Sequence, residues 1–288
     1  MIEDHYGDDG HYDEHRHTLH AAEYWFPMCR GPTPARALRL PLGGSGFRLL
    51  PLVTQVFHVG PFEVPLASAG VVTEYDIDYD AAAGRDATGA ILWPASTLVV
   101  SLLLSTFSPA MSRAVLELGC GTGFCGLVAR RLSQDVVLSD VDATMRSLAS
   151  RNSGLQPQPV AVEAYGWGVG DEWPPVQGSF GLVLASDVLY NQDALLDAPM
   201  LKRFAALLDW SLDAHGIAIV GYVERNTRGL EDVVAALRRI FVVTVLSASE
   251  CLPERLHVHL THGRGLSRCQ ALWCARRHDP TPSPIEAA

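Results

Sequence analysis

The chain contains 288 residues, of which 48% are hydrophobic and 19% are charged. This composition can build an apolar core, and it excludes a fully disordered, collagen-like or coiled-coil protein. The formal net charge of −10 argues against a broad basic surface for nucleic acid. The six cysteines form no Cys-x-x-Cys pair, and the longest apolar run, over 98–104, is too short to cross a bilayer. We therefore expect a soluble protein of the cytoplasm or nucleus, with no membrane partner.

Residues 1–46 are predicted to form a mobile tail followed by a linker. The first 20 residues hold six acids and five histidines, with too few apolar side chains to offset the entropy of ordering. Residues 31–46 are rich in Pro and Gly and are typical of a linker. Four histidines could ligate a metal if the tail were helical, but a solvated polar segment is expected: His11, His15, His17 and His20.

Residues 47–92 are predicted to form a small β extension ahead of the main domain. Short β-prone runs, LVTQVFHV at 52–59 and GVVTEYDI at 70–77, are separated by Gly60-Pro61. Such runs with turn residues between them predict a small antiparallel sheet. At the other end of the chain, 279–288 is predicted to be a disordered tail.

Residues 93–278 alternate between strand and helix patterns. Strands are expected at 114–118, 136–139, 160–163, 180–185, 217–223, 242–246 and 270–275. Helices are expected at 94–106, 124–132, 143–152, 199–212 and 230–240. Strands separated by helices predict an α/β fold with parallel βαβ units and helices on both faces of the sheet. Such a sheet binds its ligand at the carboxyl ends of its strands.

The strongest single signal is VLELGCGTGFCG at 115–126, where an apolar strand ends in glycines and a helix begins. Gly119, Gly121 and Gly123 would let the backbone turn sharply and approach a ligand closely. The N–H groups at the start of the helix are ready donors for a polar ligand. Gly121, Gly123 and Gly126 also fit G-x-G-x-x-G, so a dinucleotide is a rival ligand.

Two acidic residues help to choose between these ligands. Asp140 ends the next strand and could hold the two hydroxyls of a ribose, a feature shared with NAD sites. Glu117 lies at the strand tip, where a carboxylate would repel a pyrophosphate and favour a cation. S-adenosylmethionine has no phosphate and carries an ammonium and a sulfonium. The acidic strand tip therefore favours S-adenosylmethionine.

VLELGCGTG followed by LSDVD resembles the signature of class I, seven-β-strand S-adenosylmethionine-dependent methyltransferases. LVLASDVLYN at 182–191 resembles the Asp-x-x-Tyr motif of methyltransferase family 16, which consists mostly of protein lysine methyltransferases. GAILWPASTLVVSLL at 89–103 and the Trp167-Gly168 pair are also similar. The resemblance covers about 70–275. It implies a Rossmann-like, seven-stranded, mostly parallel sheet with helices on both faces.

The resemblance implies cofactor-binding roles for eight residues: Trp93, Glu117, Gly119, Gly121, Gly123, Asp140, Trp167 and Ala185. The glycines and Glu117 would line the methionine part, and Asp140 would hold the ribose. Trp167 would lie against the adenine, and Ala185 would touch the adenosyl group. Trp93 would enclose the cofactor or wall the methyl-transfer pocket. For both tryptophans, packing in the core is the alternative interpretation.

The resemblance also implies that Asp187 and Tyr190 are the catalytic pair. A lysine ammonium has no lone pair, so it must lose its proton before its nitrogen attacks a methyl group. The carboxylate of Asp187 would anchor the incoming cation, and the phenol of Tyr190 would orient the amine. The alternatives are that Asp187 caps a helix and that Tyr190 only packs.

The predicted function is transfer of a methyl group from S-adenosylmethionine to a side-chain nitrogen, with lysine favoured, of another protein. A small-molecule methyltransferase and a non-catalytic cofactor-binding module are the alternatives. Nicotinamide-dependent oxidoreduction is disfavoured by Glu117. No metal site is expected: the nearby pairs His257 with His259 and Cys120 with Cys125 are interpreted as polar strand residues and as inert thiols.

Overall fold

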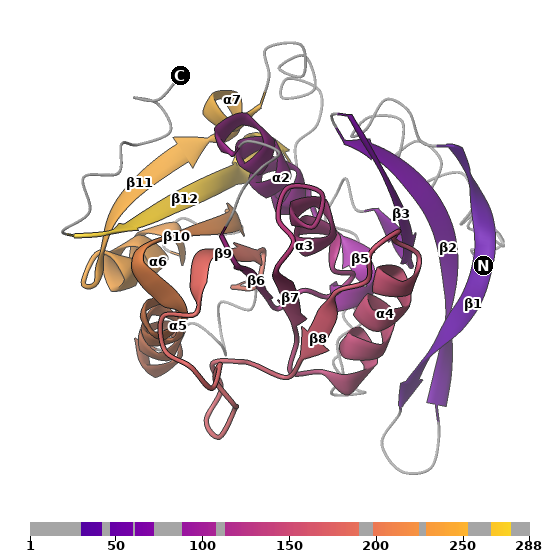
Figure 1. The fold of residues 1–288 in the computed structure, drawn as a ribbon, viewed down its shortest axis with the longest axis horizontal. Coiled ribbons are helices and arrows are strands. Elements are labelled where there is room, and N and C mark those ends of the chain that lie inside the picture. Colours follow the sequence, from indigo (N-terminus) through magenta and orange to yellow (C-terminus); the bar gives the residue numbers. More distant parts are fainter. Residues whose placement is uncertain are drawn as a thin grey trace, which may run out of the picture.

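The computed structural model describes residues 30–41, 47–59, 61–71, 88–107, 113–189, 198–224, 229–252 and 266–277. These residues form a seven-stranded central sheet, a three-stranded N-terminal sheet and a short pair of strands, β4 and β5 (Figure 1). None of the helices in these ranges is long and apolar enough to cross a membrane. Within the same ranges, no cluster of His, Cys, Asp and Glu side chains could hold a metal ion.

The central sheet has the strand order β11-β12-β10-β9-β6-β7-β8. All neighbours from β8 to β10 are parallel, and only β12 runs antiparallel to its two neighbours. The strands are β6 (Val115–Leu118), β7 (Val136–Ser139), β8 (Ala161–Glu163), β9 (Phe180–Ser186), β10 (Leu212–Val223), β11 (Phe241–Ser247) and β12 (Cys269–Arg276). The chain order reverses between β6 and β9. In open α/β sheets the ligand crevice lies at such a switch point.

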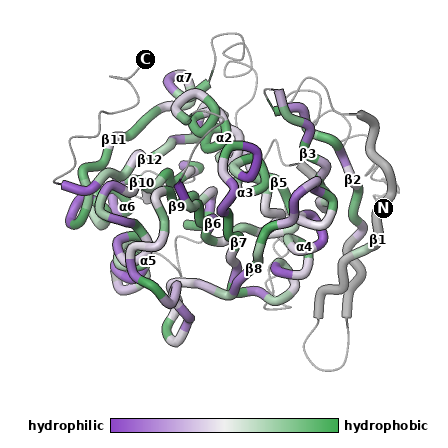
Figure 2. Tube along the Cα trace, viewed as in Figure 1, coloured by the Kyte–Doolittle hydropathy of each residue, from purple (hydrophilic) through white to green (hydrophobic). Residues whose placement is uncertain are grey.

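Helices cover both faces of this sheet (Figure 1). They are α2 (Pro94–Thr106), α3 (Phe124–Ala129), α4 (Ala143–Gly154), α5 (Ala198–Ser211), α6 (Gly229–Leu237) and α7 (Ala248–Cys251). Side chains alternate along β9: Leu182 and Leu184 join the core formed with α2 and α3, whereas Val183 and Ala185 join the core formed with α5 and α6. Figure 2 shows α2 as mostly hydrophobic, because it contacts the sheet, α3 and α7 at once.

The predicted α/β fold with its Rossmann-like, mostly parallel sheet is confirmed. The strand predicted at 136–139 and the helix predicted at 94–106 have the observed bounds of β7 and α2, and the other predicted elements of this domain are present with shifted ends. The largest shift is in β10, which starts at Leu212 rather than at 217. The helix predicted over 124–132 ends at Ala129, and a turn follows.

The N-terminal sheet consists of β1 (Arg30–Pro41), β2 (Phe47–Val59) and β3 (Phe62–Ser68), all antiparallel. The antiparallel sheet predicted after residue 47 is confirmed for β2 and β3, and residues 72–87 lie outside the described residues. The linker predicted over 31–46 is wrong for 31–41, which pair with β2. Prolines are tolerated there because β1 is an edge strand with two register shifts.

Three short elements connect the two sheets. β4 (Gly70–Val71) pairs in parallel with β5 (Ile91–Leu92), and the 3-10 helix η2 (Thr88–Ala90) precedes β5. The predicted tails, 1–29 and 279–288, lie outside the described residues. The domain boundaries at 46, 92 and 278 stay predictions.

Candidate functional site

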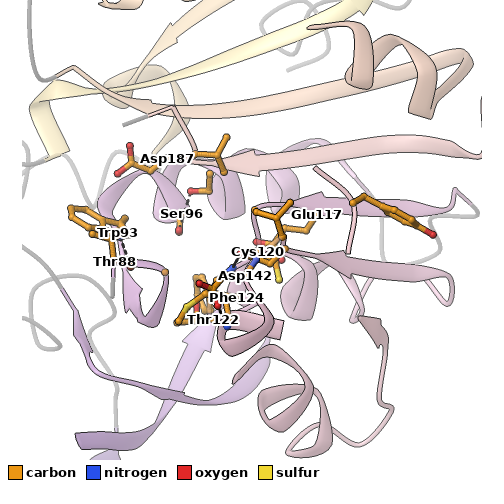
Figure 3. Close-up of a pocket in the computed structure, with 18 of the residues that line it drawn as sticks. Thr88, Trp93, Ser96, Glu117, Cys120, Thr122, Phe124, Asp142 and Asp187 are labelled. Atoms are coloured by element: carbon orange, nitrogen blue, oxygen red, sulfur yellow. Dashed lines mark hydrogen bonds between the residues drawn. The ribbon is translucent and has the colours of Figure 1, made fainter. Parts of the chain in front are cut away.

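A cavity of about 400 Å³ opens at the carboxyl ends of β6, β7 and β9, where the sheet reverses its order (Figure 3). The η2 helix and the first turn of α2 complete its wall. Seven of the predicted site residues line it: Trp93, Glu117, Gly119, Gly121, Asp140, Trp167 and Asp187. Gly123 and Ala185 do not line it, and Tyr190 lies outside the described residues.

The turn after β6 needs its glycines for backbone shape. Gly119, Gly121 and Gly123 have φ values of 61°, 51° and 80°, in the left-handed region. At Gly121 a Cβ atom would also lie 2.4 Å from the carbonyl oxygen of Gly89, so η2 sits directly on the loop. Gly123 instead is the N-cap of α3, and its Cβ would meet Leu138 at 2.8 Å. Gly123 therefore shapes the turn at the start of α3, outside the cavity lining.

Asp140 ties this loop to the tip of the next strand. Its Oδ2 accepts the N–H of Gly121 at 3.0 Å, and its Oδ1 accepts the N–H of Asp142 at 2.9 Å. Burial raises the pKa of the Asp140 carboxyl, and these two hydrogen bonds oppose the shift. Each carboxylate oxygen has a second lone pair, so Asp140 can also accept hydroxyl donors from a ligand in the cavity.

Glu117 is buried beneath the loop, with 3% of its surface exposed. Its Oε2 accepts the N–H of Gly126 at 2.8 Å. Burial raises the pKa of this carboxyl to about 8, although hydrogen bonds from Gly126 and Cys125 lower it in part. Burial therefore favours the protonated form of this carboxyl, whereas the sequence suggested an anion at this strand tip. A cation bound nearby would favour the ionised form.

Trp167 forms one wall of the cavity and also packs in the core. Its ring meets Phe204 of α5 edge-on, with ring centroids 5.2 Å apart. Arg203 donates to the carbonyl oxygens of Trp167, at 3.0 Å, and of Gly168. On its other side the ring lies 3.4 Å from where a Gly119 Cβ would be. The two interpretations of Trp167, as a ligand wall and as a packing residue, are both compatible with this position.

The opposite end of the cavity is built by α2 and by the tip of β9. Trp93, the residue before α2, donates through Nε1 to the carbonyl oxygen of Thr88 at 2.9 Å. The hydroxyls of Ser96 and Ser186 lie 3.0 Å apart. Figure 3 shows Trp93, Ser96 and Asp187 at this end, apart from the glycine loop. The cavity therefore has a loop end and a Trp93–Asp187 end.

Asp187 has an unusual backbone. Its φ is 54°, which makes it the one non-glycine residue with positive φ in the described part of the chain. Its N–H donates to the carbonyl oxygen of Gly221 at 2.8 Å, and 4% of its surface is exposed. Such strained positions cluster at functional sites. The next described helix, α5, begins 11 residues later at Ala198, so Asp187 does not cap it.

Strand alternation explains why Ala185 is not at the cavity. Its side chain is fully buried in the core against α5 and α6, and the neighbouring Ser186 faces the cavity instead. Several other lining residues were not predicted: Thr88, Ser96, Tyr165, Asp171, Ser186, Met145, Val188 and Met200. Ser96 and Ser186 lie within the motifs recognised at 89–103 and 182–191, so these motifs could have identified them as site residues. Met200 comes from a helix with no such motif.

Comparison with known proteins identifies relatives. A family model described as lysine methyltransferase matches residues 75–229. The protein-lysine methyltransferase METTL21E of Mus musculus is 32% identical over 145 residues, which is 45% of this chain and 58% of that protein. The protein N-lysine methyltransferase METTL21A of Danio rerio is 28% identical over 113 residues, or 38% and 51% of the two chains. The chain thus spans about half the length of the curated relatives it matches.

Solved structures with a similar fold were also found. An S-adenosylmethionine-dependent methyltransferase from Mesorhizobium loti aligns with a TM-score of 0.47 at 14% identity, covering 62% of this chain and 98% of that chain. The N-methyltransferase NodS of Bradyrhizobium japonicum, in complex with S-adenosyl-L-homocysteine, gives 0.46 at 15% identity, covering 64% and 86%. The family model spans more than half of this chain, including the glycine loop and Asp187. The chain belongs to the lysine methyltransferase family that this model describes.

Proposed function

We propose that the protein is an S-adenosylmethionine-dependent methyltransferase that modifies a side-chain nitrogen, with lysine favoured, of another protein. One observation carries the proposal: a single cavity at the switch point of the sheet joins the glycine loop at one end to the strained Asp187 at the other. The family membership supports the same chemistry. The relatives are named as protein-lysine methyltransferases, which supports a protein as the acceptor.

The donor set of the cavity fits S-adenosylmethionine. The cavity volume of about 400 Å³ lies in the usual range for small-molecule sites, roughly 300–1,000 Å³. Asp140 offers acceptor lone pairs for ribose hydroxyls, and Trp167 offers an aromatic face in the same cavity. Glu117 would become ionised beside a cationic ligand, whereas a pyrophosphate would keep it protonated. Of these features, the ionisation of Glu117 is the one that favours S-adenosylmethionine over a dinucleotide.

At the other end, the chain's own residues would position the acceptor. When bound, S-adenosylmethionine supplies a methyl group on a positively charged sulfur that leaves as a neutral thioether. Asp187 would anchor the incoming ammonium and direct its nitrogen at the methyl group after the proton is lost to solvent. Trp93 would exclude water from the reacting atoms. The role of Tyr190 in orienting the amine stays a prediction.

Other parts of the sequence-based interpretation also stay predictions. These are a cytoplasmic or nuclear location and the absence of nucleic-acid binding, which were both predicted from the composition of the sequence. A small-molecule acceptor and a non-catalytic binding module remain the rival functions. The same experiment separates all three functions, because it reads which molecule, if any, receives the methyl group.

The test is incubation of a cell lysate with the protein and radiolabelled S-adenosylmethionine, followed by mass spectrometry of the labelled product. We expect label on lysine of a protein. Calorimetry should show binding of S-adenosylhomocysteine and no heat with NAD. Label on a small molecule, or no label, would favour one of the rival functions. Binding of NAD alone would overturn the proposed cofactor.

Asp187→Asn tests the Trp93–Asp187 end, called the acceptor end below because the methyl acceptor would bind there. Asparagine tolerates the left-handed backbone as aspartate does, so the substitution removes the charge and keeps the conformation. We expect methyl transfer to fall about 100-fold, the scale of lost positioning, with cofactor affinity retained. Asp135→Asn is the matched control, because Asp135 is exposed and does not line the cavity. Equal activity of the two variants would remove Asp187 from the site.

A further inference from the structure

Asn152, in the last turn of α4, is completely buried. Its Oδ1 accepts the N–H of Ala67 at 2.8 Å, and its Nδ2 donates to the carbonyl oxygen of Ala67 at 2.9 Å. The same Nδ2 donates to the carbonyl oxygen of Thr122 at 2.8 Å. Both amide protons and the amide oxygen are therefore used, and they are shared between two separate parts of the chain.

These two parts have different roles. Thr122 lies between Gly121 and Gly123 in the turn after β6, and it lines the cavity (Figure 3). Ala67 belongs to β3 of the N-terminal sheet, which runs beside α4 (Figure 1). The family match begins at residue 75, so this sheet lies outside it. One buried amide thus connects an element outside the family match to the loop proposed to hold the cofactor.

A second contact reaches the same loop from the chain that follows β3. Ala69 donates its N–H to the carbonyl oxygen of Ala90 at 2.8 Å, which attaches η2 to the end of the sheet. Gly89 of η2 packs so closely against the loop that a Cβ on Gly121 would clash with the Gly89 carbonyl oxygen. The glycine loop is therefore supported on two sides by groups that are attached to the N-terminal sheet.

We propose that Asn152 is a positioning residue through which the N-terminal sheet holds the cofactor loop in its binding conformation. This inference rests on the proposed function, because it concerns the same site. Coupling between two sites is reciprocal. Occupancy of the cofactor site therefore stabilises the docking of β3, and docking of β3 increases cofactor affinity.

Gln156 provides a matched control one turn further along the chain. Its Nε2 donates to the carbonyl oxygen of Pro65 at 2.7 Å, so it also attaches β3 to the end of α4. Its side chain also bonds to the carbonyl oxygen of Asn152 and to Arg131, and these partners lie outside the glycine loop. A leucine at either position removes a buried amide that binds β3. Only the one at 152 also removes a bond to the loop.

The first experiment compares Asn152→Leu with Gln156→Leu in the full chain. Both variants should unfold at lower temperature than the wild type. Calorimetry should show S-adenosylhomocysteine affinity reduced about tenfold in Asn152→Leu and changed less than about twofold in Gln156→Leu, because only the former leaves the Thr122 carbonyl without its partner. Equal affinities in the two variants would overturn the inference.

A second measurement needs no variant, so it remains decisive if Asn152→Leu fails to fold. Hydrogen exchange of the wild type is compared with and without saturating S-adenosylhomocysteine. The peptide over 62–68 should exchange several-fold more slowly with ligand, whereas the peptide over 241–247, in β11, should not change. If the ligand binds but does not slow hydrogen exchange in β3, the proposed coupling is overturned and the proposed function is not affected. Absence of any ligand binding overturns the proposed function, and this inference with it.

Discussion

The two ends of the cavity are built in different ways. At the loop end, contacts are made by backbone groups close together in sequence: Asp140 binds the N–H of Gly121, and Glu117 binds the N–H of Gly126. At the Trp93–Asp187 end, side chains from distant segments meet, as Ser96 and Ser186 do across 90 residues. The carboxyl contacts of the loop end are therefore local in sequence, although Asn152 and η2 also support the loop from farther away. The Trp93–Asp187 end, where the acceptor would bind, depends instead on how α2 packs on the sheet.

This difference has a chemical consequence. A loop made of backbone N–H groups can bind the same ligand whatever side chains surround it, so it suits a cofactor shared by many enzymes. An end made of side chains can be altered without disturbing the loop, so it suits an acceptor that differs between enzymes. We expect substitutions at the loop end to change stability and cofactor affinity. Substitutions at the Trp93–Asp187 end should slow methyl transfer and leave cofactor affinity unchanged.

The largest expected effect concerns the ionisation of Glu117 at the loop end. The pKa of this carboxyl is about 8 when folded, above its ordinary value of 4.5, so the folded protein keeps a proton that the unfolded chain loses. Its stabilising contribution is complete below pH 4.5 and is lost as the pH rises toward 8. The free energy of unfolding without ligand should fall by about 1.4 kcal/mol per pH unit in this window.

Glu117→Gln isolates this contribution, because a glutamine oxygen can accept the same N–H from Gly126 without ionising. Urea unfolding between pH 5 and pH 8 should show a flatter dependence in the variant than in the wild type. Asp140, whose pKa is also raised by burial, leaves a residual slope of the same sign. Parallel curves for the two proteins would mean that Glu117 is already ionised in the folded protein.

The second prediction tests the close approach of η2 to the loop. Gly121→Ala should cost about 3 kcal/mol of stability, because a Cβ adds left-handed strain to a clash with the Gly89 carbonyl at 2.4 Å. Cofactor affinity should fall at least about 100-fold. Gly170→Ala is the control: its φ is 88°, but nothing lies within 4 Å of the added Cβ. It should lose about 1–2 kcal/mol and bind normally. Similar binding defects in both variants would contradict the role of the clash.

The third prediction concerns the clamp on Trp167. Arg203→Met removes the donors to the carbonyl oxygens of Trp167 and Gly168, so the aromatic wall should move and the KM for the cofactor should rise about tenfold. Arg113→Met is the control, because Arg113 also donates to two carbonyl oxygens, those of Gly181 and His215, away from the cavity. Steady-state kinetics and thermal unfolding separate the two effects. Equal KM values would show that Trp167 does not contact the cofactor.

The same division between the two ends explains what the sequence could predict. The glycine turn, Glu117 and Asp140 were recognised because their contacts span fewer than 20 residues and follow from the strand–turn–helix pattern. The raised pKa of Glu117 was not predicted, because the burial that causes it depends on tertiary packing. Nor could the sequence show that Ser186 rather than Ala185 faces the cavity, since that depends on which face of β9 packs against α5.

The N-terminal sheet shows a second reason for failure. Prolines and a Gly-rich segment made 31–46 look like a linker, yet Pro34 lies in a strand that pairs with β2. In an edge strand the N–H that proline lacks can be one that would face solvent, so no sheet hydrogen bond is lost. The sequence does not reveal which strand is at the edge. Met200 was missed for a related reason: it reaches the cavity from α5, which carries no motif.

The smallest expected effect tests the acceptor end. Ser96→Ala removes the 3.0 Å contact with Ser186 and should cost about 1 kcal/mol of stability. Ser101→Ala is a matched control on the same helix, because its hydroxyl donates to the carbonyl oxygen of Cys251 at 2.8 Å, away from the cavity. Both variants should bind S-adenosylhomocysteine as the wild type does, but only Ser96→Ala should slow methyl transfer, by several-fold. A shift in cofactor affinity in Ser96→Ala would show that the two ends are not independent, because α2 would then transmit changes to the glycine loop.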